Sequence, residues 1–341
     1  MAGSPAGAPR PTIRSVAERA GVSKSLVSLV LQGSPKVGEE RRRAVLTAVE
    51  ELGYRPDPAA RSLAERRTRT VGVVLDDLRN PWFVDLLDGL RPVLREHGLR
   101  PVLGDTRTEP GAVRTFAELR VDGLVLVGTR TGPAELDGLA RVAGTVPTVL
   151  AGGRDEVGAA VDVVADDGAA GVRLVVRHLL DLGHRHLAHL AGAGAVGRER
   201  RAAFERAAAA AGARHAVVQA DMTEDGGHRA ARRLLAGPDR PTAVLAANDV
   251  SALGVLAAAD DLGLRVPQDV SVAGYDDTSL AALRRIRLTS VDNRSRDVGR
   301  RAGQLLLDRL ADPAAPARTE LLPPRLVPRR TTAAPPPGAP A

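Results

Sequence analysis

Pairs of carboxylate and amide side chains stand at the ends of three short apolar segments of the sequence. These pairs are Asp76–Asp77 after TVGVVL, Asn248–Asp249 after TAVLAA and Asp276–Asp277 after VSVAGY. Carboxylate and amide groups can bridge the neighbouring hydroxyls of a polar ligand, and an arginine beside them would add a fork of hydrogen-bond donors. The residue types therefore predict a binding site for a small polar molecule.

The elements that must position these residues are short strands alternating with helices. From Thr70 onward, runs rich in Val and Leu alternate with helical stretches, and the same alternation returns after Asp167. This pattern is typical of parallel sheets built from strand–helix–strand units. Ligands bind such sheets beyond the carboxyl ends of their strands, where the polar pairs stand. We therefore predict two parallel α/β lobes that close on a ligand like a hinged clamp.

A structural interpretation competes with the binding one for two of these residues. Asn and Asp are preferred at helix N-caps, so Asn248 and Asp276 could simply cap the helices that follow them. From the sequence pattern alone, capping is the favoured role for both.

The first seventy residues follow a helical pattern instead. Thr12 precedes the apolar residues of one short helix, Gly21 breaks that helix, and Ser23 caps a second one. In a helix-turn-helix unit, the second helix enters the major groove of DNA by its N-terminal end. The alternative is a helical hairpin in a protein–protein module. Under the DNA-binding interpretation, the candidate base contacts are Lys24, Ser25, Ser28 and Leu29.

A third helix completes this unit, and the charge distribution supports a nucleic-acid partner. The helix is predicted over Glu39–Leu52, with Gly53 as its stop and apolar spacing given by Val45, Leu46 and Val49. Of the net charge of +7, +6 lies in the first 70 residues. A basic segment of this kind is expected where phosphates are neutralised.

The stretch that runs from TIRSVAERAGVS through ELGYRP to ARSL resembles the LacI/GalR family of bacterial transcription repressors. The resemblance implies an all-α three-helix headpiece, a hinge helix, and a two-lobed periplasmic-binding-protein-like α/β body. It also implies that Asp57 and Pro58 begin the hinge helix and that Leu63 enters the minor groove at the operator centre. The implied DNA-contacting residues are Thr12, Ser23, Lys24, Ser25, Ser28, Leu29, Tyr54, Arg61 and Leu63.

Two positions depart from the family pattern. Leu29 stands where Arg or another polar residue is common, so a contact to guanine is replaced by a side chain suited to a thymine methyl group. Gly38 stands where a capping Ser is usual, at a cost of at most a few tenths of a kcal/mol. The operator sequence therefore cannot be copied from relatives.

The body resembles the effector domain of the same family. Matching its motifs assigns Asp167, Arg200, Asn248 and Asp276 to effector contacts, and Asp76 joins them as a strand-end carboxylate. The segment NPWF resembles the family's NPFF, which makes Trp82 and Phe83 a stacking platform beside the pocket. Trp82 and Phe83 could instead be ordinary core residues, and Arg200, within RERR, could lie on a solvated helix face.

The domain boundaries follow from these assignments, and the last returning strand is expected in LLPPRLVPRRTT. We expect a disordered tail (1–10), a helix-turn-helix domain (11–56), a hinge helix with its linker (57–69), an N-lobe (70–166 and 293–321), a C-lobe (167–292 and 322–330) and a second disordered tail (331–341).

Other functional classes are disfavoured. The chain has no cysteine, which excludes thiol chemistry and disulfides, and no signal segment or long apolar run, which predicts a cytoplasmic, nucleoid-associated protein without membrane contact. A solute-binding protein, the main rival, would need that signal segment. The histidines of HRHLAHL are not spaced like zinc ligands on one helix face, and no nucleophile elbow or phosphate-binding loop follows a strand. We therefore expect a cofactor-free, metal-free, non-enzymatic homodimer that represses transcription from a palindromic operator and responds to a small effector such as a sugar.

Overall fold

The computed structural model describes residues 11–31, 33–55, 67–109, 111–128, 145–153 and 161–337. The chain divides into two compact units, residues 1–68 and residues 69–341. The predicted N-terminal tail of residues 1–10 lies outside the described residues, as do Asp57, Pro58, Arg61 and Leu63 of the predicted hinge helix. Among the described helices, none is long and apolar enough to cross a membrane.

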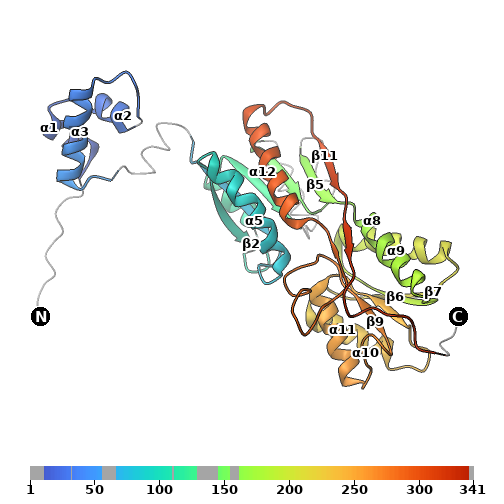
Figure 1. Ribbon diagram of the computed structural model, residues 1–341. Coiled ribbons are helices and arrows are strands. Elements are labelled where there is room, and N and C mark those ends of the chain that lie inside the picture. Colours follow the sequence, from blue (N-terminus) through green and yellow to red (C-terminus); the bar gives the residue numbers. More distant parts are fainter. Residues whose placement is uncertain are drawn as a thin grey trace, which may run out of the picture. The chain divides into compact units, whose positions relative to one another are not determined.

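The described residues of the first unit form three helices (Figure 1): α1 (Ile13–Ala20), α2 (Lys24–Leu31) and α3 (Glu39–Leu52). The hydroxyl of Thr12 caps α1 by accepting a hydrogen bond from the backbone N–H of Ser15. Gly21, in the left-handed region at φ 63°, ends α1. Ser23 then accepts a hydrogen bond from the backbone N–H of Leu26 within the first turn of α2. The caps and the break therefore lie where the sequence predicts them.

Small apolar side chains from all three helices form the core of this unit. Its fully or nearly fully buried members are Val16, Ala17, Val27, Val30, Val37, Val45 and Ala48. Leu46 was expected on the apolar face of α3, but 46% of its surface is exposed. Adjacent helical residues point about 100° apart, so Val45 and Ala48 face the core while Leu46 points to solvent.

The second unit begins with a six-stranded sheet in the order β11-β5-β4-β3-β1-β2, whose neighbouring strands are all parallel. Its strands are β1 (Thr70–Leu75), β2 (Arg100–Asp105), β3 (Gly123–Val127), β4 (Thr148–Ala151), β5 (Asp162–Asp166) and β11 (Thr319–Leu322). The strands β1, β3 and β4 are almost entirely buried, because helices cover both faces of the sheet.

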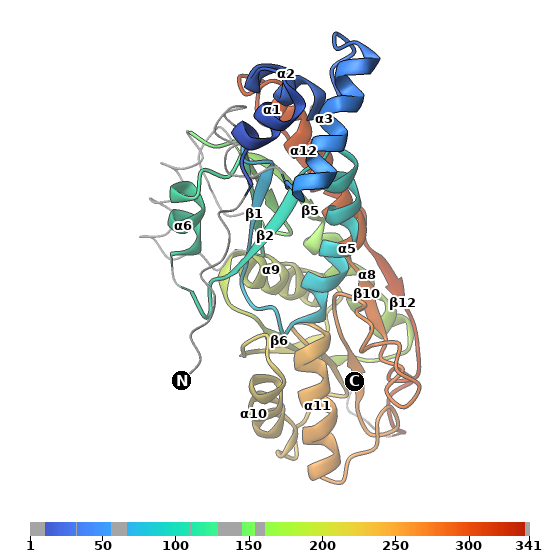
Figure 2. The same ribbon diagram turned by 90° about the vertical axis from the view of Figure 1, so that its left-hand side faces the viewer.

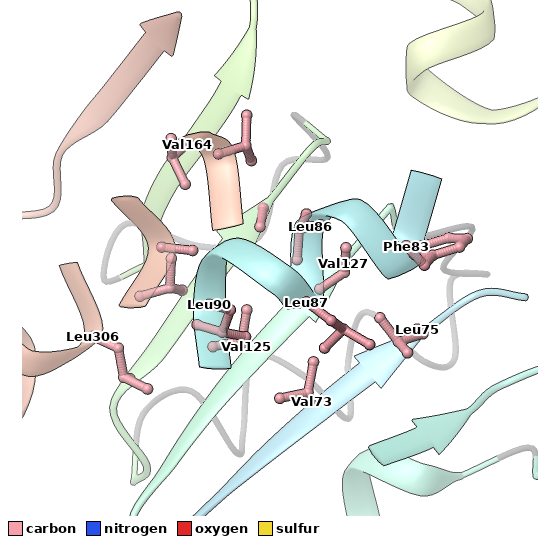
Figure 3. Close-up of a cluster of buried hydrophobic side chains, with 14 of the residues drawn as sticks. Val73, Leu75, Phe83, Leu86, Leu87, Leu90, Val125, Val127, Val164 and Leu306 are labelled. Atoms are coloured by element: carbon pink, nitrogen blue, oxygen red, sulfur yellow. The ribbon is translucent and has the colours of Figure 1, made fainter. Parts of the chain in front are cut away.

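Alternate residues of these strands pack against different helices. Val73, Leu75, Val125 and Val127 face α5 (Pro81–Glu96) and α12 (Ser295–Ala311), as Figure 3 shows, whereas Leu124 and Leu126 face α6 (Ala112–Glu118). The helices α5 and α12 lie backbone to backbone. A Cβ atom on Gly299 would come within 1.9 Å of the carbonyl oxygen of Leu86, so only glycine fits there.

A second parallel sheet has the order β7-β6-β8-β9. Its strands are β6 (His186–Ala191), β7 (Arg214–Gln219), β8 (Ala243–Leu245) and β9 (Ser271–Ala273). The helices α8 (Gly168–Asp181), α9 (Gly194–Ala210), α10 (Glu224–Leu235) and α11 (Asp249–Asp261) pack around it, and Figure 2 shows α10 and α11 side by side. The predicted combination of a helical headpiece and a parallel α/β body is therefore present. We call the parts built on the six-stranded and four-stranded sheets the first and second lobes.

The chain passes three times between the two lobes. It crosses between β5 and α8, between β10 (Ser290–Asp292) and α12, and between β11 and β12 (Arg325–Val327). The strands β10 and β12 pair antiparallel in a small sheet, and their apolar residues pack into the second lobe. Short, hydrogen-bonded crossings of this kind are typical of a hinge between lobes.

The prediction of disorder from residue 331 onward is wrong for the described part of that segment. The backbone N–H of Val272 in β9 donates to the carbonyl oxygen of Thr331, and the Thr331 hydroxyl donates to the carbonyl oxygen of Val272. Ala333 is held through Ser271 and by His184, whose Nε2 lies 2.8 Å from its carbonyl oxygen. These bonds order a segment whose composition alone predicts disorder.

Candidate effector cavity and DNA-reading helix

A cavity of about 110 Å³ lies where the carboxyl ends of the strands from both lobes meet. Strands of the first lobe bring Asp76, Gly128, Gly152 and Asp166 to it, and strands of the second lobe bring Asp221 and Asp276. Side chains from the starts of α5 and α9 and from the crossing after β10 complete the lining, including Asn80, Trp82, Phe83, Arg200 and Asn293.

A buried arginine forms the polar centre of this cavity. Arg200, 5% exposed, donates from Nη1 to the carbonyl oxygen of Ala247 at 2.9 Å and lies 3.6 Å from Asp276 Oδ1. Its guanidinium carbon is 3.5 Å from the centroid of the Tyr275 ring, a cation–π contact. The Nε atom of Arg200 is buried and has no hydrogen-bond partner among the described residues.

Carboxylates surround this arginine. The Tyr275 hydroxyl donates to Asp166 Oδ2 at 2.6 Å, which fixes that carboxylate beside the cavity. Burial raises the pKa of Asp276 well above its usual range, and the nearby charge of Arg200 offsets part of that rise. Asp76, Asp77 and Asp221 add three more carboxylates to the lining. Acceptor oxygens therefore outnumber donors around the cavity.

Trp82 forms one wall of the cavity and packs tightly on the backbone. Its ring meets that of Phe83 edge to face, with 5.1 Å between the centroids. A Cβ atom on Gly152 would come within 2.2 Å of Trp82, so glycine is required there. The indole Nε1 donates to Asn293 Oδ1 at 3.1 Å, and Asn293 Nδ2 donates to Asp276 Oδ1 at 2.9 Å.

Five of the seven residues predicted to contact the effector line the cavity: Asp76, Trp82, Phe83, Arg200 and Asp276. Asp167 and Asn248 do not, and both cap helices instead. Asp167 accepts from the backbone N–H of Ala170 at 2.8 Å, and Asn248 accepts from that of Ser251 at 2.9 Å. Asn248 is fully buried and also donates to the carbonyl oxygen of Met222, a residue of the cavity lining. In this structure the two residues cap helices outside the cavity lining, and their assignment to direct effector contacts stays a prediction.

Several lining residues were missed by the sequence reasoning. Asp166 ends β5, and Asp221 follows β7 by two residues, so the rule that ligands bind beyond strand ends would have found both. Asn293 follows β10, which has only three residues and carries no recognisable pattern. The start of α9, residues 193–196, presents small side chains and backbone rather than a chemical signature.

Two of the three histidines of HRHLAHL make structural hydrogen bonds. His184 Nδ1 lies 2.8 Å from the Thr242 hydroxyl, and His189 Nδ1 lies 3.0 Å from the carbonyl oxygen of Leu245. Within the described ranges, no group of three His, Cys, Asp or Glu side chains could hold a metal ion.

Burial lowers the pKa of His189 from 6.5 to about 4. As the pH falls from 6.5 to 4, His189 therefore becomes protonated in the unfolded chain but stays neutral in the folded protein. The stability contributed by the neutral ring is complete above pH 6.5 and is lost in this window, by roughly 3 kcal/mol. We expect the unfolding free energy of His189→Leu, measured in urea, to fall less steeply over this range than that of the native protein. Parallel pH profiles would contradict this assignment.

The second helix of the first unit presents its predicted face to solvent. Lys24, Ser25 and Leu29 are exposed and Ser28 is half-buried, while Val27 and Val30 face the core. Thr12 and Ser23 are exposed at the starts of α1 and α2, and Tyr54 packs partly against the core. A solvent-exposed helix start with a lysine, two serines and an apolar side chain can reach phosphates, base edges and a thymine methyl group.

Known proteins resemble this chain along nearly its whole length. A family model for bacterial regulatory proteins of the lacI family matches residues 12–57, and one for a periplasmic binding protein-like domain matches residues 176–332. The HTH-type transcriptional repressor PurR of Erwinia tasmaniensis is 34% identical over 331 residues, which cover 94% of this chain and 97% of that protein.

Solved structures of transcriptional regulators are also similar to this chain along nearly its whole length. The lac repressor dimer bound to operator and the anti-inducer ONPF has a TM-score of 0.85 at 29% identity, covering 95% of this chain and 99% of that one. The transcriptional regulator CelR in complex with cellobiose has a TM-score of 0.71 at 32% identity, covering 94% of this chain and 100% of that one.

Proposed function

Since this chain belongs to the LacI family of bacterial regulatory proteins, we propose that it represses transcription as a homodimer on a palindromic operator, under the control of a sugar or sugar derivative. The protein is a DNA-binding transcriptional regulator with a helix-turn-helix headpiece and an effector-binding body, as predicted. The observation that carries the proposal is the polar cavity at the junction of the two lobes.

The chemistry of the lining supports a ligand rich in hydroxyl groups. Among the described residues that line the cavity there are five aspartates and one guanidinium, and Asp276 lies beside that guanidinium. Ligand hydroxyls can donate to these carboxylates, whereas a phosphate or carboxylate would be repelled by them. A volume of about 110 Å³ is close to that of the engineered cavity of about 150 Å³ that holds one benzene ring, which suits a ligand of about one ring. The complex of CelR with cellobiose supports the same ligand class.

The headpiece supports the DNA half of the proposal. We assign base or phosphate contacts to Thr12, Ser23, Lys24, Ser25, Ser28, Leu29 and Tyr54. The hinge residues Arg61 and Leu63, which lie outside the described residues, would contact the operator centre. The lac repressor dimer on its operator supports the dimeric arrangement. Closure of the lobes on a ligand would change the spacing of the two hinges, and a coupling of about 1–3 kcal/mol would alter operator affinity about 5–150-fold.

The remaining parts of the proposal are the domain limits and the setting. We assign the helix-turn-helix domain to residues 11–56, the hinge to 57–69, and the lobes to 70–166 with 293–321 and 167–292 with 322–330. The relatives are transcriptional regulators, so we assign no catalytic activity, cofactor or metal. We propose that the protein acts in the bacterial cytoplasm, on the nucleoid.

Selection of bound DNA with the purified full chain tests the proposal. Random duplexes bound by the protein are recovered and sequenced, with and without neutral sugars. An enriched palindrome with a flexible central step is expected, because two symmetric headpieces would read it. The absence of any enriched sequence at low salt, with or without sugars, would refute a repressor function.

The salt dependence of binding to the selected operator is a separate prediction. If four phosphates are neutralised, affinity should fall about 100-fold between 50 and 200 mM salt through release of counterions. Binding is measured by fluorescence anisotropy across that range. An affinity that does not change with salt would be inconsistent with phosphate contacts by the basic headpiece.

A further inference from the structure

A chain of hydrogen bonds connects the two lobes across the floor of the cavity. Trp82 belongs to α5 of the first lobe, and Asp276 follows β9 of the second lobe. Asn293, in the crossing between β10 and α12, joins them by accepting from Trp82 Nε1 at 3.1 Å and donating to Asp276 Oδ1 at 2.9 Å. All three side chains line the cavity.

The central residue of this chain must both donate and accept a hydrogen bond, as an amide does. Asn293 is 2% exposed, and its side chain must accept from an indole and donate to a carboxylate at the same time. An aspartate there would accept from Trp82 but would place a second carboxylate against Asp276. A leucine would keep the volume but leave the indole N–H and the Asp276 oxygen without this partner. The site therefore selects for asparagine on chemical grounds.

The backbone on both sides of the chain is strained. Asp276, Asp277 and Arg294 all have positive φ, at 106°, 50° and 62°. Non-glycine residues in such conformations cost about 1–3 kcal/mol each, persist only where the surrounding structure holds them, and cluster at ligand clamps and switches. Here Asp276 and Asp277 follow β9 in the second lobe, and Arg294 follows Asn293 in the crossing between β10 and α12.

Movement of this crossing would be transmitted to the first lobe. The helix α12 begins at Ser295, two residues after Asn293. Its contact with α5 is too close for independent motion, since Gly89 and Gly299 allow backbone atoms of the two helices to approach within van der Waals distance. A shift of Asn293 would therefore move α12 and α5 together.

We propose that Asn293 is the positioning residue that sets the angle between the lobes of the empty protein, by linking Trp82 to Asp276. A ligand hydroxyl that donates to Asp276 Oδ1 would share that oxygen with Asn293 and so weaken the link. The lobe angle is a property of the body alone. Its link to operator affinity rests on the proposed function.

Distances between spin labels on the two lobes test this inference without a ligand. The chain has no cysteine, so Arg91→Cys on α5 and Arg233→Cys on α10, both exposed, give one label on each lobe. In this labelled background, we expect Asn293→Leu to broaden or shift the distance distribution measured by pulsed electron spin resonance. Asn293→Gln, which keeps the donor and the acceptor, should stay closer to the parent.

Thr278→Val is the matched control. It removes a buried 2.9 Å hydrogen bond to Asp249 inside the second lobe and does not touch the link between lobes. If Asn293→Leu changes the distribution no more than Thr278→Val does, the link does not set the lobe angle and the inference is wrong.

A second measurement separates this inference from the proposed function. On the operator selected above, Asn293→Leu should change affinity about fivefold or more in the absence of any sugar, as expected for a shifted equilibrium between two states. An altered distance distribution with unchanged operator affinity would support the link but contradict its use in repression. If no operator is found, the spin-label result still decides whether Asn293 holds the lobes.

Discussion

Replacing Arg200 with methionine is expected to lower the free energy of unfolding by about 3–5 kcal/mol, because the change leaves a buried carboxylate without its partner. Arg200 and Asp276 are 5% and 7% exposed, and Tyr275 also loses the guanidinium stacked on its ring. Urea denaturation of the full chain measures the loss. At urea concentrations where the variant remains folded, its operator affinity should also fail to respond to any sugar that acts on the native protein.

The pH dependence of this loss identifies its cause. The pKa of Asp276 is already raised by burial, and removal of Arg200 raises it further. A carboxyl group whose pKa is raised in the folded state keeps its proton to a higher pH in the folded state than in the unfolded chain. The folded state therefore loses stability as the pH rises above about 4, the ordinary pKa of the group. The deficit of Arg200→Met should therefore be larger at pH 8 than at pH 5.

The double variant Arg200→Met with Asp276→Asn is the control. It removes the unpaired charge, so it should be more stable than Arg200→Met alone at pH 8. The cost of Asp276→Asn is also measured in the native protein. If Asp276→Asn lowers the stability of Arg200→Met by that same amount, the two residues do not interact and the pairing assigned to them is wrong.

Replacing Leu29 with arginine is expected to change which base pair the protein reads. Leu29, 38% exposed on α2, is suited to contact a thymine methyl group, whereas an arginine there can bond the O6 and N7 atoms of guanine. Each mismatched base pair costs about 1–3 kcal/mol, so affinity for the native operator should fall about 5–150-fold. Sequencing of the DNA that the variant selects should show a guanine at one position of each half-site.

Leu46→Arg provides the matched control for the added charge. Leu46 is exposed to a similar extent, at 46%, but it lies on α3 rather than on the helix assigned to the major groove. The added charge should affect binding to all sequences alike and leave the selected operator unchanged. If both arginine variants select the native operator, Leu29 does not contact a base.

The sequence predicts the elements of this fold better than it predicts the contacts of its polar residues. Helical spacing locates the helices of the headpiece, because burial of one face imposes a period on the residue types, and apolar runs locate the strands β1 and β6, which are buried on both faces. No such period separates a helix cap from a ligand contact. Asn248 and Asp276 both follow strands, yet one caps α11 and the other lines the cavity. The difference lies in backbone conformation, since Asp276 has a φ of 106°.

Residues far apart in sequence account for the other gaps. Asn293 becomes part of the cavity only because its neighbours in space, Trp82 and Asp276, come from different lobes. Thr331 is ordered by partners about 40 and 60 residues away, in the segments around Thr289 and Val272. Composition near a chain end carries no information on such partners, which is why the tail was predicted to be disordered.

The ordered segment at Thr331–Ala333 has a consequence for how copies of this protein behave together. It lies along β9, an edge strand of the four-stranded sheet, and satisfies backbone groups there that would otherwise be open. Open strand edges pair readily with strands of other molecules and are common starting points of aggregation. A chain cut after Arg330 would expose this edge, whereas a purification tag fused after Ala341 would leave it covered.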